Sequence, residues 1–319
     1  MKIVVVGAGG VGGYFGGRLA ATGSDVTFVA RGEHLAALRR NGLRIESALG
    51  NALIRPVKVT DDPATLGHAD MVWIAVKLWG TEEAARAIAP LMGPETAVIS
   101  FQNGVEAEDL LLRLYGRERV MGGVAHIAAV IEQPGIIRHN GTLQKLAFGE
   151  LDGRRSPRAE ALLAACRGAG IDASIPADIN RGIWEKFVFL VGLSGMTALT
   201  RQPIGAVRED PDSRAMLLEV MREAAAVARA KGVVLASDAA EQQLAFTDGL
   251  PAAMISSMLG DLRRGNRLEL PWLAGAVVRL GRELGVSTPM NSAVYAALKP
   301  YADGAVPQAK PAPAAAGSD

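Results

Sequence analysis

Lys186 is the residue whose sequence surroundings most directly suggest a role in proton transfer. It lies in the stretch INRGIWEKFVFLVGL, where a helix would place Ile183, Phe189 and Leu190 on the same face as the lysine. A lysine in an apolar stripe either extends its ammonium into water or is partly desolvated in a cleft. Only desolvation would lower its pKa toward a role in proton transfer. The sequence by itself leaves both alternatives open.

Further polar residues stand at expected element ends. Lys77 ends the apolar run MVWIAVK, and Asn103 follows VISFQ, where ligands bind in an open parallel sheet. A strand-end lysine can also be only a solvated charge, and an asparagine before glycine only a turn. Glu269, just before Pro271, either belongs to a site or interacts with the dipole at the start of the next helix. The residues around Ser257 do not by themselves indicate a function for it.

A glycine cluster follows the first apolar run, KIVVV, and fits the spacing G-x-G-x-x-G at the start of an expected helix. Its members are Gly7, Ala8, Gly9, Gly10, Val11 and Gly12. The first glycine would allow a tight turn, the second the approach of a pyrophosphate, and the third close packing of helix and strand. The helix N-terminus would stabilise the phosphate charge. The cluster therefore predicts a dinucleotide site.

Arg31 follows the next expected strand, at the position where a carboxylate would bind the ribose 2′-hydroxyl of NAD. An arginine there can instead pair with a 2′-phosphate, which predicts NADP(H) as the cofactor. The alternative is a solvated arginine at the start of the following helix.

Composition excludes several classes of function. The 319 residues carry a formal net charge of +1 with scattered cations, so neither nucleic acid nor a membrane surface is indicated as a partner. The single cysteine, Cys166, cannot form an internal disulfide and favours a reducing compartment, so we expect a cytoplasmic protein. No zinc-ligand spacing and no G-x-S-x-G occurs, so no metal site and no hydrolase is indicated. We expect neither a signal peptide nor a transmembrane segment, because the apolar run from Phe187 is shorter than the roughly 18 residues that span a membrane.

The elements that position these residues form two patterns. Up to about residue 175, short β-branched runs alternate with helical stretches, which predicts an α/β fold with a doubly wound parallel sheet of Rossmann type. Pro134-Gly135 indicates a hairpin and Asn140-Gly141 a second tight turn, so an antiparallel extension should close the sheet. After Pro176 only helical patterns follow. We expect a dinucleotide-binding domain at 1–177, a helical domain at 178–302 that is compatible with a homodimer, and a disordered tail at 303–319.

Taken together, the chain resembles the ketopantoate reductase (2-dehydropantoate 2-reductase) family from Met1 to about residue 300. The resemblance rests on GAGGVGGYFGGRLA, Arg31, AVKLW, QNGVE, WEKF and SSMLGDLRRGNRLEL, which occur in the family's order. It implies an NADPH-dependent reduction of a 2-oxo acid, ketopantoate to pantoate in pantothenate biosynthesis, at a site between a Rossmann domain and a helical domain.

The resemblance also implies a role for each candidate residue. Lys186 would be the general acid that protonates the carbonyl oxygen, and Asn103 would orient that carbonyl and help position the nicotinamide ribose. Lys77 would lie near the cofactor and Ser257 at the substrate. Glu269 would complete the catalytic pair, at the nicotinamide ribose or a neighbouring lysine.

The substrate pocket departs from the family pattern. Where the family carries asparagines after the catalytic lysine, this chain has Leu190, Ser194 and Ile204. A more apolar 2-oxo acid is therefore an alternative substrate. A protein that senses NADP(H) without turnover is a second alternative, which the retention of Lys186 and Glu269 disfavours.

Overall fold

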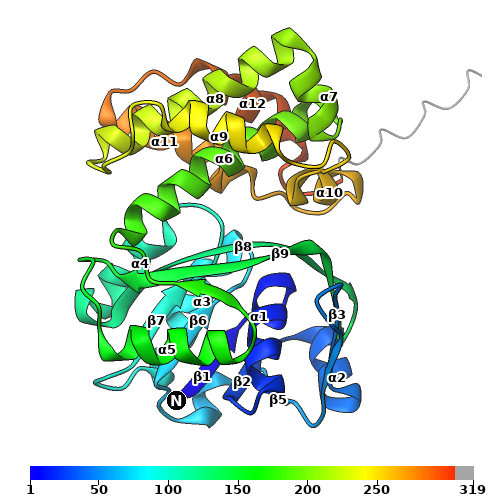
Figure 1. Ribbon diagram of the computed structural model, residues 1–319, viewed down its shortest axis with the longest axis vertical. Coiled ribbons are helices and arrows are strands. Elements are labelled where there is room, and N and C mark those ends of the chain that lie inside the picture. The colour runs from blue at the N-terminus through cyan, green and yellow to red at the C-terminus, as the bar shows by residue number, and fades with distance from the viewer. Residues whose placement is uncertain (306–319) are drawn as a thin grey trace, which may run out of the picture.

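The computed structural model describes residues 1–305. The prediction of a disordered tail at 303–319 was wrong for 303–305, because Gly304 N donates a hydrogen bond to Tyr301 O and Ala305 N donates one of 2.9 Å to Gly265 O. From residue 306 on, the predicted tail lies outside the described residues. Figure 1 shows the α/β part below and the helical part above, with β8 and β9 passing between them and α6 leading from one part to the other.

A single mixed sheet of ten strands, in the order β4-β3-β9-β8-β7-β6-β1-β2-β5 with β10 beside β9, forms the first part. The six strands β8, β7, β6, β1, β2 and β5 run parallel to one another. Strands β3 and β10 are each parallel to β9. Strand β9 is antiparallel to β8, and β4 is antiparallel to β3. The strands are β1 (Lys2–Val6), β2 (Asp25–Val29), β3 (Leu43–Glu46), β4 (Ala52–Ile54), β5 (Lys58–Thr60), β6 (Met71–Ile74), β7 (Ala97–Ser100), β8 (Val120–Gln133), β9 (Ile136–Glu150) and β10 (Asp172–Ser174).

Helices cover both faces of the sheet, which confirms the doubly wound arrangement. Ile3 and Val5 of β1 pack in one core with α1 (Gly10–Ala21), α2 (Gly32–Asn41) and α5 (Pro157–Gly168). Val4 and Val6 point to the opposite face and pack with α3 (Thr81–Ala87) and α4 (Ala107–Tyr115). Such a strand, buried on both sides, explains the continuous apolar run KIVVV.

The β8–β9 hairpin supplies the expected antiparallel extension. Pro134-Gly135 forms its turn, and Gly135 has a φ of 85°, which a glycine tolerates without strain. The prediction of a second tight turn at Asn140-Gly141 was wrong, because β9 continues through these residues. The pairing passes from Ala129–His139 to Ile127–Gln144, so four residues of β9 bulge opposite one residue of β8.

Between β10 and residue 305 the structure contains only helices. The α-helices are α6 (Ile179–Thr200), α7 (Ile204–Glu209), α8 (Pro211–Ala230), α9 (Ala239–Asp248), α10 (Ser257–Arg263), α11 (Ala274–Leu284) and α12 (Pro289–Leu298). The side chain of Asp178 caps α6 by accepting a hydrogen bond from Arg181 N. Among residues 1–305, α6 is the one helix long and apolar enough to cross a membrane, but 67% of its apolar window is buried inside the protein, as in a core helix.

Candidate active site

The glycine-rich loop follows β1 and opens α1. A Cβ at Gly7 would lie 2.7 Å from the backbone of Ala75, and one at Gly12 only 2.1 Å from Gly7 O, so both positions require the absence of a side chain. At Gly9 a Cβ would meet nothing within 4 Å. The backbone at Gly9 is therefore open to an approaching group, at the N-terminus of a helix that favours negative charge. These residues fit a dinucleotide pyrophosphate.

Arg31 immediately precedes α2 and its side chain makes no capping hydrogen bond. Its guanidinium lies 2.6 Å from Glu83 Oε1 of α3, and both side chains are about two-thirds exposed. An exposed ion pair contributes little free energy of its own, so a more highly charged partner could replace Glu83.

Asn103 lies in the loop after β7, and Gln102 fixes that loop. The buried Gln102 amide donates hydrogen bonds to Val76 O and Thr81 Oγ1, at 2.8 and 2.9 Å, and so ties the loop after β7 to the loop after β6. Asn103 Oδ1 accepts a hydrogen bond of 3.0 Å from Lys186 Nζ. The structure thus brings together two of the candidate residues from opposite parts of the chain.

Lys186 is desolvated. The residue lies two turns into α6 and is half-buried, and burial lowers the pKa of its ammonium to about 8 although Glu269 partly offsets the effect. Because its Nζ donates a hydrogen bond to Asn103, the structure favours the desolvated alternative over a lysine that only extends into solvent. An amine with this pKa is mostly protonated at neutral pH and gives up its proton readily.

Lys77 and Glu269 form an ion pair between the two parts of the chain. Lys77 Nζ lies 3.4 Å from Glu269 Oε2 and 3.0 Å from Asp261 Oδ2. Glu269 is buried, and its Oε1 also accepts a hydrogen bond of 3.1 Å from Leu78 N. Burial would lower the pKa of Lys77, but the two carboxylates outweigh it and raise that pKa. Lys77 therefore stays a cation.

Asp261 is a member of this cluster that the sequence analysis missed. Burial would raise the pKa of its carboxyl, but Lys77, Arg264 and Asn266 hold it below the ordinary value. Arg264 donates at 2.8 Å and Asn266 at 3.3 Å to Asp261 Oδ1. The available signal was its place in SSMLGDL, four residues after Ser257 and so on the same face of α10.

The remaining substrate candidates differ in exposure. Ser257 is exposed at the first position of α10, while its neighbour Ser256 caps that helix. Of the residues that replace the family's asparagines, Leu190 is half-buried, whereas Ser194 and Ile204 are buried at 3% and 0% exposure. Only Leu190 of these three keeps a side-chain surface that a ligand could contact.

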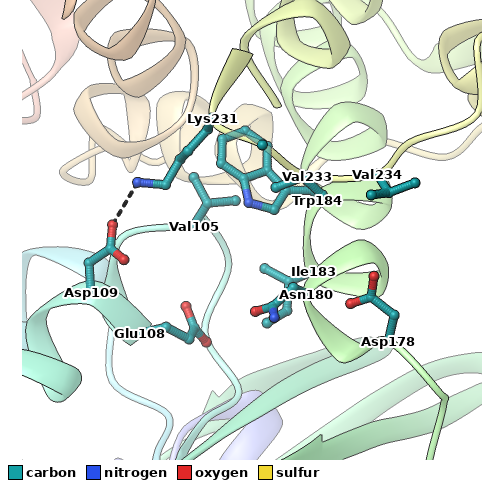
Figure 2. A pocket seen from close by; sticks show the side chains of 11 residues that line it. Val105, Glu108, Asp109, Asp178, Asn180, Ile183, Trp184, Lys231, Val233 and Val234 are labelled. Atoms are coloured by element: carbon teal, nitrogen blue, oxygen red, sulfur yellow. Dashed lines mark hydrogen bonds and ion pairs between the residues drawn. The ribbon is translucent and has the colours of Figure 1, made fainter. Parts of the chain in front are cut away.

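A cavity of about 290 Å³ lies between the two parts of the chain, lined by residues of the segments 105–109, 178–184 and 231–234 and by none of the candidate site residues. Figure 2 shows Glu108 of α4 and Asn180 of α6 on opposite sides of it, with Lys231 bound to Asp109. That ion pair measures 2.9 Å. Burial raises the pKa of Glu108 to about 7. Within residues 1–305, no group of three or more His, Cys, Asp or Glu side chains is placed to hold a metal ion.

Comparisons with known proteins cover both parts. A family model described as ketopantoate reductase PanE/ApbA matches residues 3–153, and one for the C-terminal part of ketopantoate reductase PanE/ApbA matches residues 178–302. The chain is 32% identical over 301 residues to the uncharacterized oxidoreductase YkpB of Bacillus subtilis, covering 94% of this chain and 99% of that protein. It is also 32% identical over 330 residues to a 2-dehydropantoate 2-reductase of Mesorhizobium japonicum, covering 94% and 97%.

A solved structure agrees with the family models and with these relatives. The 2-dehydropantoate 2-reductase from Geobacter metallireducens superposes with a TM-score of 0.87 at 31% identity, over 94% of this chain and 99% of that one. Family models along most of the chain and relatives at this identity, on a fold that carries the glycine-rich loop and the paired lysine and asparagine, lead to one conclusion. The chain belongs to the ketopantoate reductase family of oxidoreductases.

Proposed function

We propose that this protein reduces a 2-oxo acid to a 2-hydroxy acid with NADPH as the reductant. The observation that carries the proposal is the hydrogen bond of 3.0 Å from Lys186 Nζ to Asn103 Oδ1, at the same edge of the sheet as the glycine-rich loop. A desolvated lysine beside an amide, close to a dinucleotide loop, supports carbonyl reduction.

The residues for binding the cofactor are those of the glycine-rich loop and Arg31. The open backbone at Gly9 would hold the pyrophosphate, and Arg31 would turn from Glu83 to the 2′-phosphate, which carries more charge than one carboxylate. Lys77, which stays a cation, would lie along the cofactor, with Glu269 accepting from a ribose hydroxyl.

When bound, the nicotinamide supplies a hydride to the carbonyl carbon of the 2-oxo acid. Lys186 Nζ gives a proton to the carbonyl oxygen as negative charge develops there, and the oxygen becomes the product hydroxyl. Asn103 holds the ammonium in place through its Oδ1, and its amide N–H can donate to the same carbonyl oxygen. Ser257, at the start of α10, would contact the substrate.

The substrate is ketopantoate or a more apolar 2-oxo acid. Leu190 offers no hydrogen bond to a substrate hydroxyl, and leaving a buried hydroxyl unpaired costs about 1–3 kcal/mol. We assign the reaction to the cytoplasm, because the single thiol, Cys166, is buried and unreactive, with its pKa raised by burial to about 12.

Loss of NADPH absorbance with a panel of 2-oxo acids tests the proposal. Lys186→Ala should lower kcat by about 10² to 10⁴ and leave the Kd of NADPH unchanged. Wild-type protein that binds NADPH but turns over no 2-oxo acid would instead identify a nucleotide sensor. A kcat/KM for ketopantoate more than about tenfold above that for every apolar analogue, about 1.36 kcal/mol, would exclude the apolar substrate.

A further inference from the structure

His126 lies on β8 beneath helix α6. A Cβ at Gly122 would lie 3.1 Å from Ile183 Cδ1, and a Cβ at Gly182 would lie 4.0 Å from Val124 Cγ2, so these faces of β8 and α6 are packed together. Alternate residues of a strand share a face, as do residues of a helix four positions apart. The next residues in these two series are His126 on β8 and Lys186 on α6.

The pKa of His126 agrees with this position near Lys186. Burial, then the ammonium of Lys186, then that of Lys145, lower the pKa of His126 to about 4. Lys145 is the residue directly opposite His126 on β9, so it lies on the same face of the hairpin. The imidazole is therefore neutral at pH 7, with one N–H donor, in the field of two positive charges.

The ring nitrogens of His126 have no hydrogen-bond partner within residues 1–305, which separates it from the histidines that support the fold. Both nitrogens of His34 are bonded, to Ala8 O and Gly135 N, and both of His139, to Ser47 Oγ and Leu143 O. His126 is half-buried and lies in a strand. A polar ring placed there without a partner is available to a ligand.

The course of β8 leads from the proton donor to the cofactor loop. Ahead of His126, Gly123 packs against Phe101 of the segment that leads to Asn103. Beyond it, a Cβ at Gly10 would lie 2.0 Å from Ala129 O. His126 thus comes between the stretch of β8 that approaches Asn103 and the stretch that contacts the glycine-rich loop.

We propose that His126 is a substrate-binding residue whose neutral imidazole donates a hydrogen bond to the carboxylate of the 2-oxo acid. The inference rests on the proposed function. Lys186 is committed to the carbonyl oxygen, and α6 offers Leu190 one turn further on, so the carboxylate needs donors from outside α6, and Ser257 of α10 would be at most one of them. The sheet side supplies one at His126, where Lys186 and Lys145 favour an anion.

The test compares His126→Phe, which keeps an aromatic ring without a donor, with His126→Gln, which restores an N–H. His126→Phe should raise KM for the 2-oxo acid by about tenfold or more, the effect of losing a hydrogen bond to a charged group, with kcat changed less than about threefold. His126→Gln should recover a large part of that loss. The Kd of NADPH should not change, and His68→Phe, at an exposed histidine, should match the wild type.

Binding of oxamate, a non-reducible 2-oxo acid analogue, to the protein with NADPH separates this inference from the proposed function. Weaker oxamate binding to His126→Phe supports the inference even if no 2-oxo acid is turned over. Turnover by the wild type with an unchanged KM in His126→Phe leaves the proposed function standing and overturns the inference. The inference is also overturned if His126→Phe lowers only kcat, if both His126 variants lose NADPH affinity, or if the wild type does not bind oxamate. If the Phe variant does not fold, the Gln variant must still keep a KM closer to that of the wild type than His126→Ala does.

Discussion

The pH dependence of catalysis tests the state of Lys186 directly. With a pKa of about 8, about nine-tenths of the ammonium is protonated at pH 7 and about one-tenth at pH 9. A general acid must carry its proton, so kcat/KM for the 2-oxo acid at saturating NADPH should fall about tenfold between these two pH values. An unperturbed lysine, at a pKa near 10.5, would give almost no fall over the same range.

Two variants assign this alkaline limb to Lys186. Glu269 raises the pKa of Lys186, so Glu269→Gln should move the limb to lower pH, while the glutamine oxygen can still accept from Leu78 N. Lys186→Arg should give a slower enzyme whose rate does not fall up to about pH 10, because a guanidinium stays protonated. Steady-state rates from about pH 6 to pH 10, with the Kd of NADPH measured at each pH, provide the data. A wild-type profile that stays flat to pH 10 would refute the desolvated general acid.

Other perturbations test the cofactor loop and the cavity. Arg31→Ala should weaken NADPH binding by about 1.5–3 kcal/mol and leave NADH binding unchanged. Glu83→Gln should modestly tighten NADPH binding, because it frees the arginine from its ion pair. Equal losses of NADPH and NADH affinity in Arg31→Ala would contradict this role. Gly9→Ala should fold normally and bind NADPH poorly, while Gly12→Ala should lose about 1–3 kcal/mol of stability, because only its Cβ meets backbone; melting curves with and without NADPH distinguish the two. Glu108→Gln should raise the melting temperature more at pH 8 than at pH 5. Burial raises the pKa of Glu108 from 4.5 to about 7, so the carboxyl destabilises the folded state increasingly between these two pH values and fully above pH 7. An equal gain at both pH values would show that the carboxyl is not desolvated.

Local patterns in the sequence were sufficient to predict the glycine-rich loop and the alternation of strands and helices. The loop depends on a strand, a turn and a helix that are adjacent in the chain, so its geometry is encoded within one short segment. No strand is predicted from the sequence of residues 43–60, although β3, β4 and β5 lie there. These strands have three or four residues each, and β3 pairs with β9, about ninety residues away in sequence. Such pairing leaves almost no local signal.

The site was predicted least well where it depends on contacts between distant segments. Lys77 was singled out as a strand-end residue, but nothing near it in sequence identifies Asp261, which lies 184 residues further on, as a partner. Nothing near His126 in sequence identifies it as a site residue, because its neighbours are apolar. Its relation to Lys186 follows from the packing of α6 on β8, which no pattern within either segment specifies.

The two lysines of the site show how environment rather than residue type sets function. Burial disfavours the ammonium of each, although the Lys77 side chain is 43% exposed and Lys186 is half-buried. Lys77 lies against the carboxylates of Asp261 and Glu269, which outweigh burial and raise its pKa, so it serves as a fixed positive charge. Lys186 has an uncharged amide as its direct partner and only the more distant effect of Glu269, so burial prevails and its pKa falls to about 8. In the proposed reaction these two lysines, with pKa values shifted in opposite directions, would divide the work of binding the anionic cofactor and delivering the proton.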